Sequence, residues 1–296
     1  MELSEKLCDG GQDQRSLESQ TSNSRPITNR EYSPLEPENI FNWIIHGSCE
    51  SMTEIPDQSV HLVVTSPPYN TNKEYEQGMG FDDWLQLMQR VFGEVRRVLV
   101  PGGRACINIA NTGRNPYEPL HYYLTGIMLD LDFLMRGEVI WNKGASVGTS
   151  TAWGSWKSAS NPVLRDVHEY ILIFSKDTMK RTKKGESTIG KNEFLECTKS
   201  IWHFPTESAK RIGHPSPFPL ELPRRLIQLY SFVGDMILDP FCGSGTTCVA
   251  AALTGRDYIG YDKSFEYSRL ARCRISEAVK SLQKIEVAGR QPTGNP

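Results

Sequence analysis

Residues 236–247, with the sequence MILDPFCGSGTT, constrain the fold more than any other stretch of the chain. An apolar run ends at Asp239, two glycines follow at Gly243 and Gly245, and Thr246 and Thr247 begin a helical pattern. Glycines at such a turn allow a ligand to approach the backbone, where a Cβ would block it. The free N–H groups of the following helix favour a carboxylate or phosphate nearby. The stretch therefore predicts a strand, a ligand-binding turn and a helix.

Asp262 lies at the end of the next expected strand, where a carboxylate accepts hydrogen bonds from ribose hydroxyls. The turn and Asp262 together suit a nucleoside ligand. A dinucleotide site is one alternative, but Cys248 replaces the third glycine of the GxGxxG pattern, which disfavours NAD. A tight strand–helix turn that binds no ligand is the other alternative.

Strands and helices alternate along the rest of the chain, after an apolar run that begins near Ile40. Alternation of this kind favours an α/β fold, with a doubly wound, mostly parallel sheet that has helices on both faces. Short apolar runs predict further strands at 60–64, 104–110, 137–143 and 168–176. Helical spacing predicts helices from 81 to the stop at 101–103, at about 119–131, after 214 and at about 264–286.

Composition sets only broad limits on function. The formal net charge of −2 gives no global signature of nucleic-acid binding, so any such binding depends on local basic patches. No apolar run is long enough to span a bilayer and no signal-peptide pattern is present, so we expect a cytoplasmic protein. None of the seven cysteines forms a CxxC pair and the histidines do not cluster with them, which predicts no metal site.

Residues 63–72, VVTSPPYNTN, form the second informative stretch. A buried strand is expected to end here in a hydroxyl at Ser66, two rigid prolines at Pro67 and Pro68, and an aromatic ring at Tyr69. Taken alone, the stretch fits a rigid turn with a buried tyrosine. Together with the glycine turn, the stretch is better explained by a functional role than by a structural turn alone.

TSPPY at 65–69 and DPFCGSGTT at 239–247 together resemble the catalytic and cofactor motifs of the DNA amino-methyltransferases, and their order along the chain matches the beta class of that family. The resemblance covers roughly residues 40–275. Three further stretches are similar to other motifs of the family: RVLVPGG at 97–103, HEYILIFSK at 168–176 and HPSPFPLEL at 214–222. GSWKSASNP at 154–162 is similar to a stretch in the cytosine-directed members of the family.

This resemblance implies S-adenosylmethionine as cofactor and a Rossmann-like methyltransferase domain with a small, loop-rich target-recognition region. It assigns the catalytic role to Ser66, Pro67, Pro68 and Tyr69. The residues that it implies around the cofactor are Asp239, Pro240, Phe241, Gly243, Gly245, Thr246, Thr247 and Asp262, with Pro215, Phe218 and Pro219 above it.

The chemistry of amine methylation explains the Ser-Pro-Pro-Tyr pattern. The exocyclic amine of a base is a poor nucleophile, because its lone pair is delocalised into the ring. The Ser66 hydroxyl and the Pro67 carbonyl offer two acceptors for the amine hydrogens, and the prolines hold these acceptors in place. Tyr69 offers a ring on which a flipped base stacks. The methyl group would then transfer by direct displacement, without a covalent enzyme intermediate.

Ser66 bears on which base is methylated. The N4-cytosine enzymes of the family mostly carry Ser at this position and its adenine enzymes mostly carry Asp, so the resemblance favours N4 of cytosine. Cytosine-C5 chemistry requires a thiolate, usually in a Pro-Cys context that this chain lacks. Adenine-N6 methylation, methylation of RNA or a small amine, and a catalytically silent DNA-binding regulator remain alternatives.

The chain departs from the family pattern before the first motif. Gly47-Ser48 stands where relatives often have Gly-Asp, and His61 stands where they often have Asp. A carboxylate that assists from either position is therefore absent. Asp57 is the nearest acidic residue, and we expect it to lie in the turn PDQS.

Double-stranded DNA is the expected partner, with a homodimer and a cognate restriction endonuclease as further possibilities. We predict that the chain comprises a tail at 1–37, a catalytic part at 38–144, a DNA-contacting insert at 145–213 with one core strand, a cofactor part at 214–286 and a tail at 287–296. Candidate DNA contacts are Asn70, Lys143, Trp153, Trp156, Lys157, Arg165, Lys180, Arg181, Lys183 and Lys184.

Overall fold

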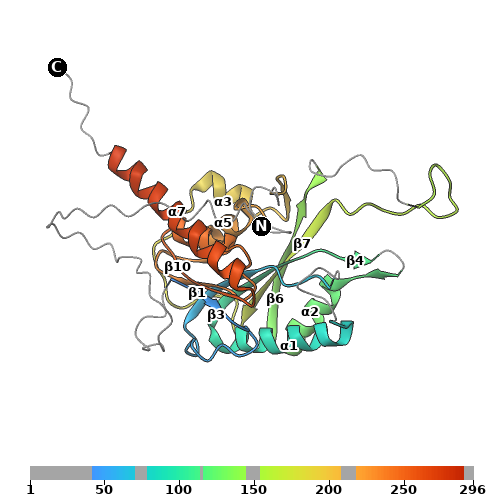
Figure 1. Ribbon diagram of the computed structural model, residues 1–296, viewed down its shortest axis with the longest axis horizontal. Helices are drawn as coiled ribbons and strands as arrows, with labels where there is room; N and C mark the ends of the chain where they lie inside the picture. Colours follow the sequence, from blue (N-terminus) through green and yellow to red (C-terminus); the bar gives the residue numbers. More distant parts are fainter. Residues whose placement is uncertain (1–41, 71–78, 114–115, 145–153, 208–217, 290–296) are drawn as a thin grey trace, which may run out of the picture. The chain divides into compact units, whose positions relative to one another are not determined.

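The computed structural model describes residues 42–70, 79–113, 116–144, 154–207 and 218–289 (Figure 1). Their central feature is an eight-stranded sheet with the order β1-β10-β9-β2-β3-β7-β6-β8. The sheet is parallel except for β7, which runs antiparallel to both of its neighbours. In sheet order, the strands are Trp43–His46, Asp257–Asp262, Met236–Asp239, Val60–Thr65, Leu99–Ile109, His168–Lys176, Phe133–Asn142 and Ile201–His203. A separate small hairpin pairs β4 (Thr112–Gly113) with β5 (Tyr117–Glu118).

Helices cover both faces of this sheet, which confirms the doubly wound, mostly parallel fold (Figure 1). One face packs on α1 (Phe81–Val98) and α2 (Leu120–Asp130). The other face packs on α5 (Glu221–Tyr230), α6 (Thr246–Leu253) and α7 (Phe265–Gly289), with α3 (Lys191–Cys197) next to α5.

The period of two along each strand explains how both faces are filled. On β7, Leu172 and Phe174 belong to the core on the α1 side, whereas Ile171 and Ile173 belong to the core on the α5 side. A strand that is apolar on both faces reads as a continuous apolar run, as YILIF at 170–174 does.

The direction of the strands defines two edges of the sheet. Strands β1, β10, β9, β2 and β3 are parallel, so their carboxyl ends share one edge, which we call the carboxyl edge. The antiparallel strand β7 begins at this edge with His168 and ends at the opposite amino edge with Lys176. Ligands of open α/β sheets bind at the carboxyl edge.

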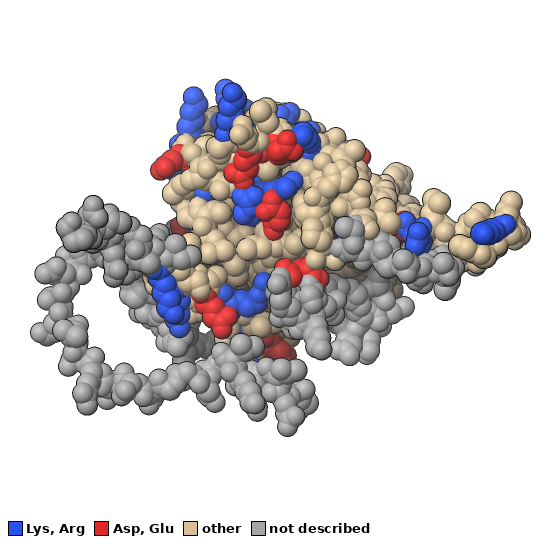
Figure 2. Space-filling view, turned by 90° about the horizontal axis from the view of Figure 1, so that it is seen from above, with Lys and Arg blue, Asp and Glu red and all other residues tan. Residues whose placement is uncertain are grey.

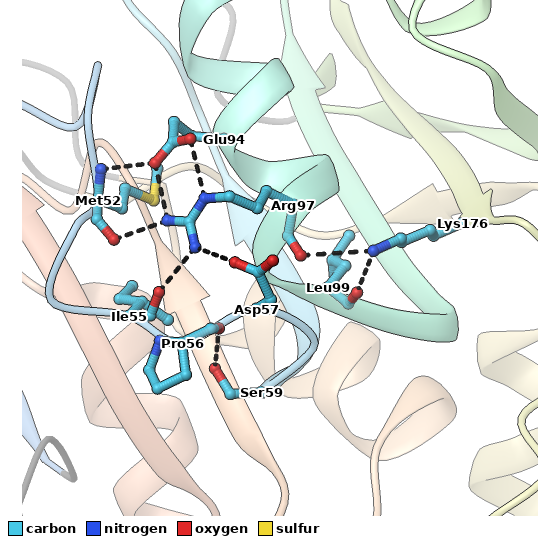
Figure 3. Close-up of polar contacts among 9 residues, drawn as sticks. All are labelled: Met52, Ile55, Pro56, Asp57, Ser59, Glu94, Arg97, Leu99 and Lys176. Carbon is cyan, nitrogen blue, oxygen red and sulfur yellow. Dashed lines mark hydrogen bonds and ion pairs between the residues drawn. The ribbon is translucent and has the colours of Figure 1, made fainter. Parts of the chain in front are cut away.

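Arg97, near the end of α1, joins that helix to the loop that precedes β2 (Figure 3). Its guanidinium donates hydrogen bonds to Asp57 at 2.6 Å and to Glu94 at 2.8 Å. It also donates to the carbonyls of Met52 and Ile55 at 2.8 and 2.9 Å. Asp57 therefore serves the loop before β2, in agreement with its expected place in a turn.

Several observed elements differ from those predicted; β6, for example, begins at Phe133 instead of residue 137. Strand β3 begins at Leu99 instead of residue 104, because Leu99 already pairs with Val60 of β2. Helix α7 continues to Gly289, past the predicted end at 286. Strand β8 joins the sheet beside β6 with Trp202 buried, so the segment 145–213 supplies a second core strand that the sequence did not predict. No helix in the described ranges meets the length and hydrophobicity needed to cross a membrane.

Candidate active site

A cavity of about 420 Å³ lies at the carboxyl edge of the sheet, and both informative stretches line it. The Ser-Pro-Pro-Tyr stretch follows β2 and the glycine turn follows β9, and these two strands are neighbours in the sheet. The residues that line the cavity from these stretches are Ser66, Pro67, Pro68, Tyr69, Pro240, Phe241, Cys242, Gly243, Ser244 and Thr246.

Two buried side chains connect the strand ends beneath the cavity. Thr65 Oγ1, at the end of β2, donates a hydrogen bond to Asp239 Oδ1 at 2.7 Å. Thr247 Oγ1, in the first turn of α6, donates to the carbonyl of Val64 at 3.2 Å. The two motifs are thereby held at a fixed distance before any ligand binds.

The Ser-Pro-Pro-Tyr stretch is also anchored from α1. Trp84 has no exposed surface, and its indole Nε1 donates a hydrogen bond to the carbonyl of Pro68 at 2.7 Å. Together with the fixed φ angles of the two prolines, this bond restricts the backbone that carries Ser66 and Tyr69. The Trp84 indole binds the Pro68 carbonyl and not the Pro67 carbonyl, which is the predicted acceptor for the amine.

A hydrogen-bonded network extends from Ser66 to Lys143, and we call these five residues the Tyr69 network: Ser66, Tyr69, Asn108, Lys143 and Glu169. The Tyr69 hydroxyl is 2.9 Å from Ser66 Oγ and donates to Glu169 Oε2 at 3.0 Å. Asn108 Nδ2 donates to the Tyr69 hydroxyl at 2.9 Å and to Glu169 Oε2 at 2.6 Å. Lys143 Nζ donates to Glu169 Oε1 at 2.6 Å.

Glu169 and Asn108 were not among the predicted site residues. Both line the cavity, Glu169 from the start of β7 and Asn108 from the end of β3. The sequence held one signal that could have identified them: each is a polar residue in an otherwise apolar strand, close to the strand end that lies at the carboxyl edge. Further lining residues that the sequence did not single out include Cys49, Met79, Trp141, Thr206, Glu207, Lys263, Ser264 and Tyr267.

Asp262 closes the glycine turn from the neighbouring strand. Its Oδ2 accepts a hydrogen bond from the Gly243 N–H at 2.9 Å, and its Oδ1 accepts one from the Ser264 N–H at 2.8 Å. Burial raises the pKa of this carboxyl, and the two backbone hydrogen bonds oppose the increase. Because each carboxylate oxygen accepts more than one hydrogen bond, Asp262 retains capacity for a ligand hydroxyl in the cavity.

Six of the predicted cofactor residues line the cavity: Phe218, Pro240, Phe241, Gly243, Thr246 and Asp262. Four others are not part of its wall: Pro219, Asp239, Gly245 and Thr247. Pro219 is buried, and Asp239 and Thr247 bind the end of β2. Pro215 lies outside the described residues.

Gly245 is required by packing and backbone conformation. Its φ is +78°, in the left-handed region that side chains disfavour. A Cβ at this position would lie 2.7 Å from the Cβ of Ala271 on α7. The absence of a side chain therefore lets α7 approach the start of α6, and Gly245 itself does not line the cavity.

The predicted DNA contacts near the cavity occupy different environments. Asn70 follows Tyr69 in a left-handed conformation with φ of +51°, and Lys143 is held in its ion pair with Glu169. Trp156 is 69% exposed, with the Lys157 ammonium 5.6 Å from its ring centroid, and Arg165 is also exposed. Trp153 lies outside the described residues.

Residues 154–165 project from the body of the molecule between β6 and β7 (Figure 1). Gly154 pairs with Pro162, and the Ser155 N–H donates to the carbonyl of Asn161 at 2.8 Å, so the segment folds back on itself as an arm. Figure 2 shows Lys and Arg side chains along this projecting arm. Basic and aromatic side chains on an exposed arm suit contact with a nucleic-acid backbone and bases.

The remaining basic candidates lie at the opposite edge of the sheet. The segment that holds Lys180, Arg181, Lys183 and Lys184 follows Lys176, where β7 ends at the amino edge. Arg181 forms a bidentate pair with Asp235, which directly precedes β9. These four residues therefore lie at the edge of the sheet opposite the cavity, and a DNA contact from them stays a prediction.

His61 is likewise remote from the cavity. Its Nδ1 accepts a hydrogen bond from the Met236 N–H at 3.0 Å, and its Nε2 lies 3.7 Å from Asp235 at the amino edge. Burial lowers its pKa. Gly47 does line the cavity, whereas the Ser48 hydroxyl donates to Glu50 at 3.0 Å.

Comparison with known proteins agrees with this geometry. Residues 60–272 match the family model of the DNA methylases of the N6/N4 type. Type II methyltransferase M.MthZI of Methanothermobacter thermautotrophicus is 31% identical over 271 residues, which cover 79% of this chain and 76% of that protein.

Two solved structures extend the comparison. TTHA0409 of Thermus thermophilus, described as a DNA modification methylase and complexed with S-adenosyl-L-methionine, is 33% identical with a TM-score of 0.66, over 80% of this chain and 94% of that chain. PvuII DNA methyltransferase, described as cytosine-N4-specific, is 19% identical with a TM-score of 0.65, over 82% of this chain and 93% of that chain. The similarity to the PvuII enzyme supports a shared fold only.

Proposed function

Because the chain belongs to the N6/N4 family of DNA methylases, we propose that it transfers a methyl group from S-adenosylmethionine to the N4 amine of a cytosine flipped out of duplex DNA. One observation carries the proposal. Ser66–Tyr69 and the glycine turn open onto the same cavity, so a base held by one stretch and a cofactor held by the other would meet there. Methyl transfer requires such a contact between the two ligands.

The residues around the glycine turn fit S-adenosylmethionine. The cavity volume of about 420 Å³ lies in the range of small-molecule sites, which is about 300–1,000 Å³. Phe218 and Phe241 supply apolar surface, Thr246 lies at the start of α6 where a carboxylate is favoured, and Asp262 has acceptor capacity for ribose hydroxyls. The bound cofactor supplies an electrophilic methyl group on a sulfonium.

The Ser-Pro-Pro-Tyr stretch would bind and orient the amine. The Ser66 hydroxyl oxygen and the Pro67 carbonyl accept its two hydrogens, which favours a nitrogen whose lone pair points away from the ring plane. The bond from Trp84 to the Pro68 carbonyl keeps these acceptors in place. Tyr69 supplies an aromatic face for a flipped base.

Ser66 supports cytosine rather than adenine as the base, by the resemblance to N4-specific members of the family. Relatives named as Type II methyltransferases support a place in a restriction–modification system. We extend the proposal to a partner endonuclease that recognises the same site, and to a homodimer.

Analysis of the methylated nucleoside tests the proposal. The enzyme is incubated with labelled S-adenosylmethionine and, in parallel reactions, with RNA or with whole-genome-amplified DNA, which carries no prior methylation. The nucleic acid is then digested and its nucleosides are examined by mass spectrometry. We expect N4-methylcytosine. N6-methyladenine would assign the adenine reaction to this scaffold, and label in RNA but not in DNA would overturn DNA as substrate. Binding of DNA without any transfer would indicate a silent regulator.

Ser66→Ala and Tyr69→Ala separate catalysis from cofactor binding. Ser66→Ala removes one acceptor of the amine, and we expect the transfer rate to fall about 100-fold or more, as when one preorganised hydrogen-bond partner is removed. Tyr69→Ala removes the stacking face, and we expect it to lose most transfer. The affinity for S-adenosylmethionine, measured by calorimetry, should stay near that of the wild type. Unchanged rates in both variants would refute the catalytic assignment.

A further inference from the structure

The Tyr69 network contains more polar groups than are needed to hold the amine. Glu169 and Lys143 are both largely buried, with side chains 13% and 18% exposed. Within the network, Glu169 is joined to Ser66 through the Tyr69 hydroxyl. Placing an ion pair at a cavity wall carries a desolvation cost, so its position calls for a functional reason.

The direction of each hydrogen bond in this network can be derived from its members. A tyrosine hydroxyl has one hydrogen to donate and accepts at its lone pairs, whereas an ionised carboxylate only accepts. Because Glu169 is paired with Lys143, the Tyr69 hydrogen goes to Glu169. Asn108 Nδ2 donates to the Tyr69 oxygen and occupies one acceptor position.

The contact between Tyr69 and Ser66 then has one direction. The only hydrogen of Tyr69 is used by Glu169, so Ser66 must donate its hydrogen to Tyr69 across the 2.9 Å contact. The Ser66 oxygen consequently presents lone pairs to the cavity and no hydrogen. An exocyclic amine donates two hydrogens, so this is the orientation of the hydroxyl that can receive it.

We propose that Glu169 is a positioning residue that acts through Tyr69 to fix the Ser66 hydroxyl as a hydrogen-bond acceptor for the target amine, with Lys143 holding Glu169 in place. This inference rests on the proposed transfer to an amine. In this proposal Lys143 orients Glu169 and does not act as the DNA contact that the sequence predicted. It also accounts for an ion pair whose two partners come from β7 and from the residue after β6.

Glu169→Gln tests the inference with little change in shape. Lys143 selects the carbonyl oxygen of the new amide, which leaves the NH₂ group facing Tyr69. This NH₂ group cannot accept the hydrogen of Tyr69 or that of Asn108 Nδ2, both of which Glu169 Oε2 accepts in the wild type. The Tyr69 hydrogen therefore turns to Ser66, and the serine loses an acceptor position. We expect the single-turnover transfer rate on whole-genome-amplified DNA to fall about 100-fold, with cofactor affinity unchanged.

A double-mutant cycle with Tyr69→Phe distinguishes positioning from a structural role. Tyr69→Phe keeps the aromatic ring and removes the hydroxyl through which Glu169 acts. We therefore expect Glu169→Gln to have little further effect in the Tyr69→Phe background. Losses that multiply in the double variant would overturn the inference. The control is Glu138→Gln, the same chemical change on the exposed side of β6, which should leave the rate unchanged.

The outcomes separate this inference from the proposed function. No transfer by the wild type would overturn the proposed function, whereas transfer by the wild type and an equal rate in Glu169→Gln would overturn the inference alone. Should Glu169→Gln fail to fold, Tyr69→Phe combined with Ser66→Ala tests the same chain of bonds. We expect these two losses to be coupled, and fully independent losses would contradict the proposal.

Discussion

Asp239 has no exposed surface, although Pro240 directly after it lines the cavity. Its Oδ1 accepts hydrogen bonds from Thr65 at 2.7 Å and from the Phe241 N–H at 3.1 Å, while Oδ2 is buried without a hydrogen-bond partner among the described residues. Burial raises the pKa of this carboxyl to about 6, and the hydrogen bond from Thr65 opposes the increase. Asp239 therefore supports the site from below and carries a free-energy cost when it ionises.

Asp239→Asn should remove a pH dependence of stability. The raised pKa means that the folded protein keeps a proton which the unfolded chain loses above about pH 4, so stability falls as the pH rises toward about 6. Asparagine retains the Oδ1 acceptor and does not titrate. We expect the free energy of unfolding of the variant to gain up to about 3 kcal/mol relative to wild type between pH 4 and 7, measured by urea denaturation. A difference that is constant with pH would contradict this role.

Sequence reasoning found the two stretches that meet at the cavity but fewer than half of the residues that line it, and it could not divide the predicted residues by role. A glycine that faces a ligand and a glycine that admits a helix follow the same pattern, so Gly243 and Gly245 were given one role. Glu169 was missed as a site residue because it begins an apolar strand, and only the antiparallel direction of β7 brings its start to the carboxyl edge.

At the scale of elements, α1 connects both edges of the sheet. Trp84 near its start holds the Pro68 carbonyl at the cavity, and Arg97 near its end holds the loop before β2 (Figure 3). The apolar positions of this helix face the sheet, from Trp84 to Val98. Helix α1 thus fixes the position of β2 and of the Ser66 stretch that follows it.

Arg97→Met should destabilise the protein by about 2 kcal/mol, because two carbonyls lose their donor and Glu94 loses its cation and keeps the Met52 N–H. Arg90→Met is the matched control on the same helix. Arg90 is 51% exposed and pairs with Glu50, so its loss should cost less than about 1 kcal/mol. Urea denaturation of both variants measures the difference. Equal losses would contradict the role assigned to Arg97.

Long periodic elements were predicted well, and short ones were not. The strand 168–176 and the helices near 119–131 and 264–286 were located to within a few residues, because their apolar patterns extend over many positions. Helix α3 and the three-residue strand β8 carry too few residues for a period to emerge. Residues 201–203 form strand β8 because they pair with β6 at the edge of the sheet. This pairing is a tertiary interaction, so the local sequence does not predict it.

At the scale of the whole molecule, the sheet separates two basic regions. The arm at 154–165 arises at the carboxyl edge between β6 and β7, whereas Lys183 and Lys184 follow the amino-edge end of β7. Both regions are exposed and basic, so composition alone does not distinguish them. Because the arm arises at the same edge as the cavity, we propose the arm as the region that contacts bound DNA.

Charge removal at the two regions should therefore have different effects. We expect Lys157→Ala combined with Arg165→Ala to weaken DNA binding and to reduce the salt dependence by about 0.9 in slope for each phosphate that is no longer neutralised. Lys183→Ala combined with Lys184→Ala removes the same charge and should leave both quantities near wild type. Fluorescence anisotropy across a salt series measures them. A larger effect from the second pair would reverse the assignment.

The central claim is that one cavity brings the cofactor methyl group to the acceptors of the Ser66 stretch. A crystal structure with bound S-adenosylmethionine tests it most directly, through the distance from the methyl carbon to Ser66 Oγ. A hydrogen bond of about 3 Å and an attack distance of about 3–3.5 Å predict a separation of at most about 6.5 Å. A cofactor bound away from the glycine turn, or with its methyl group directed away from Ser66, would contradict the account.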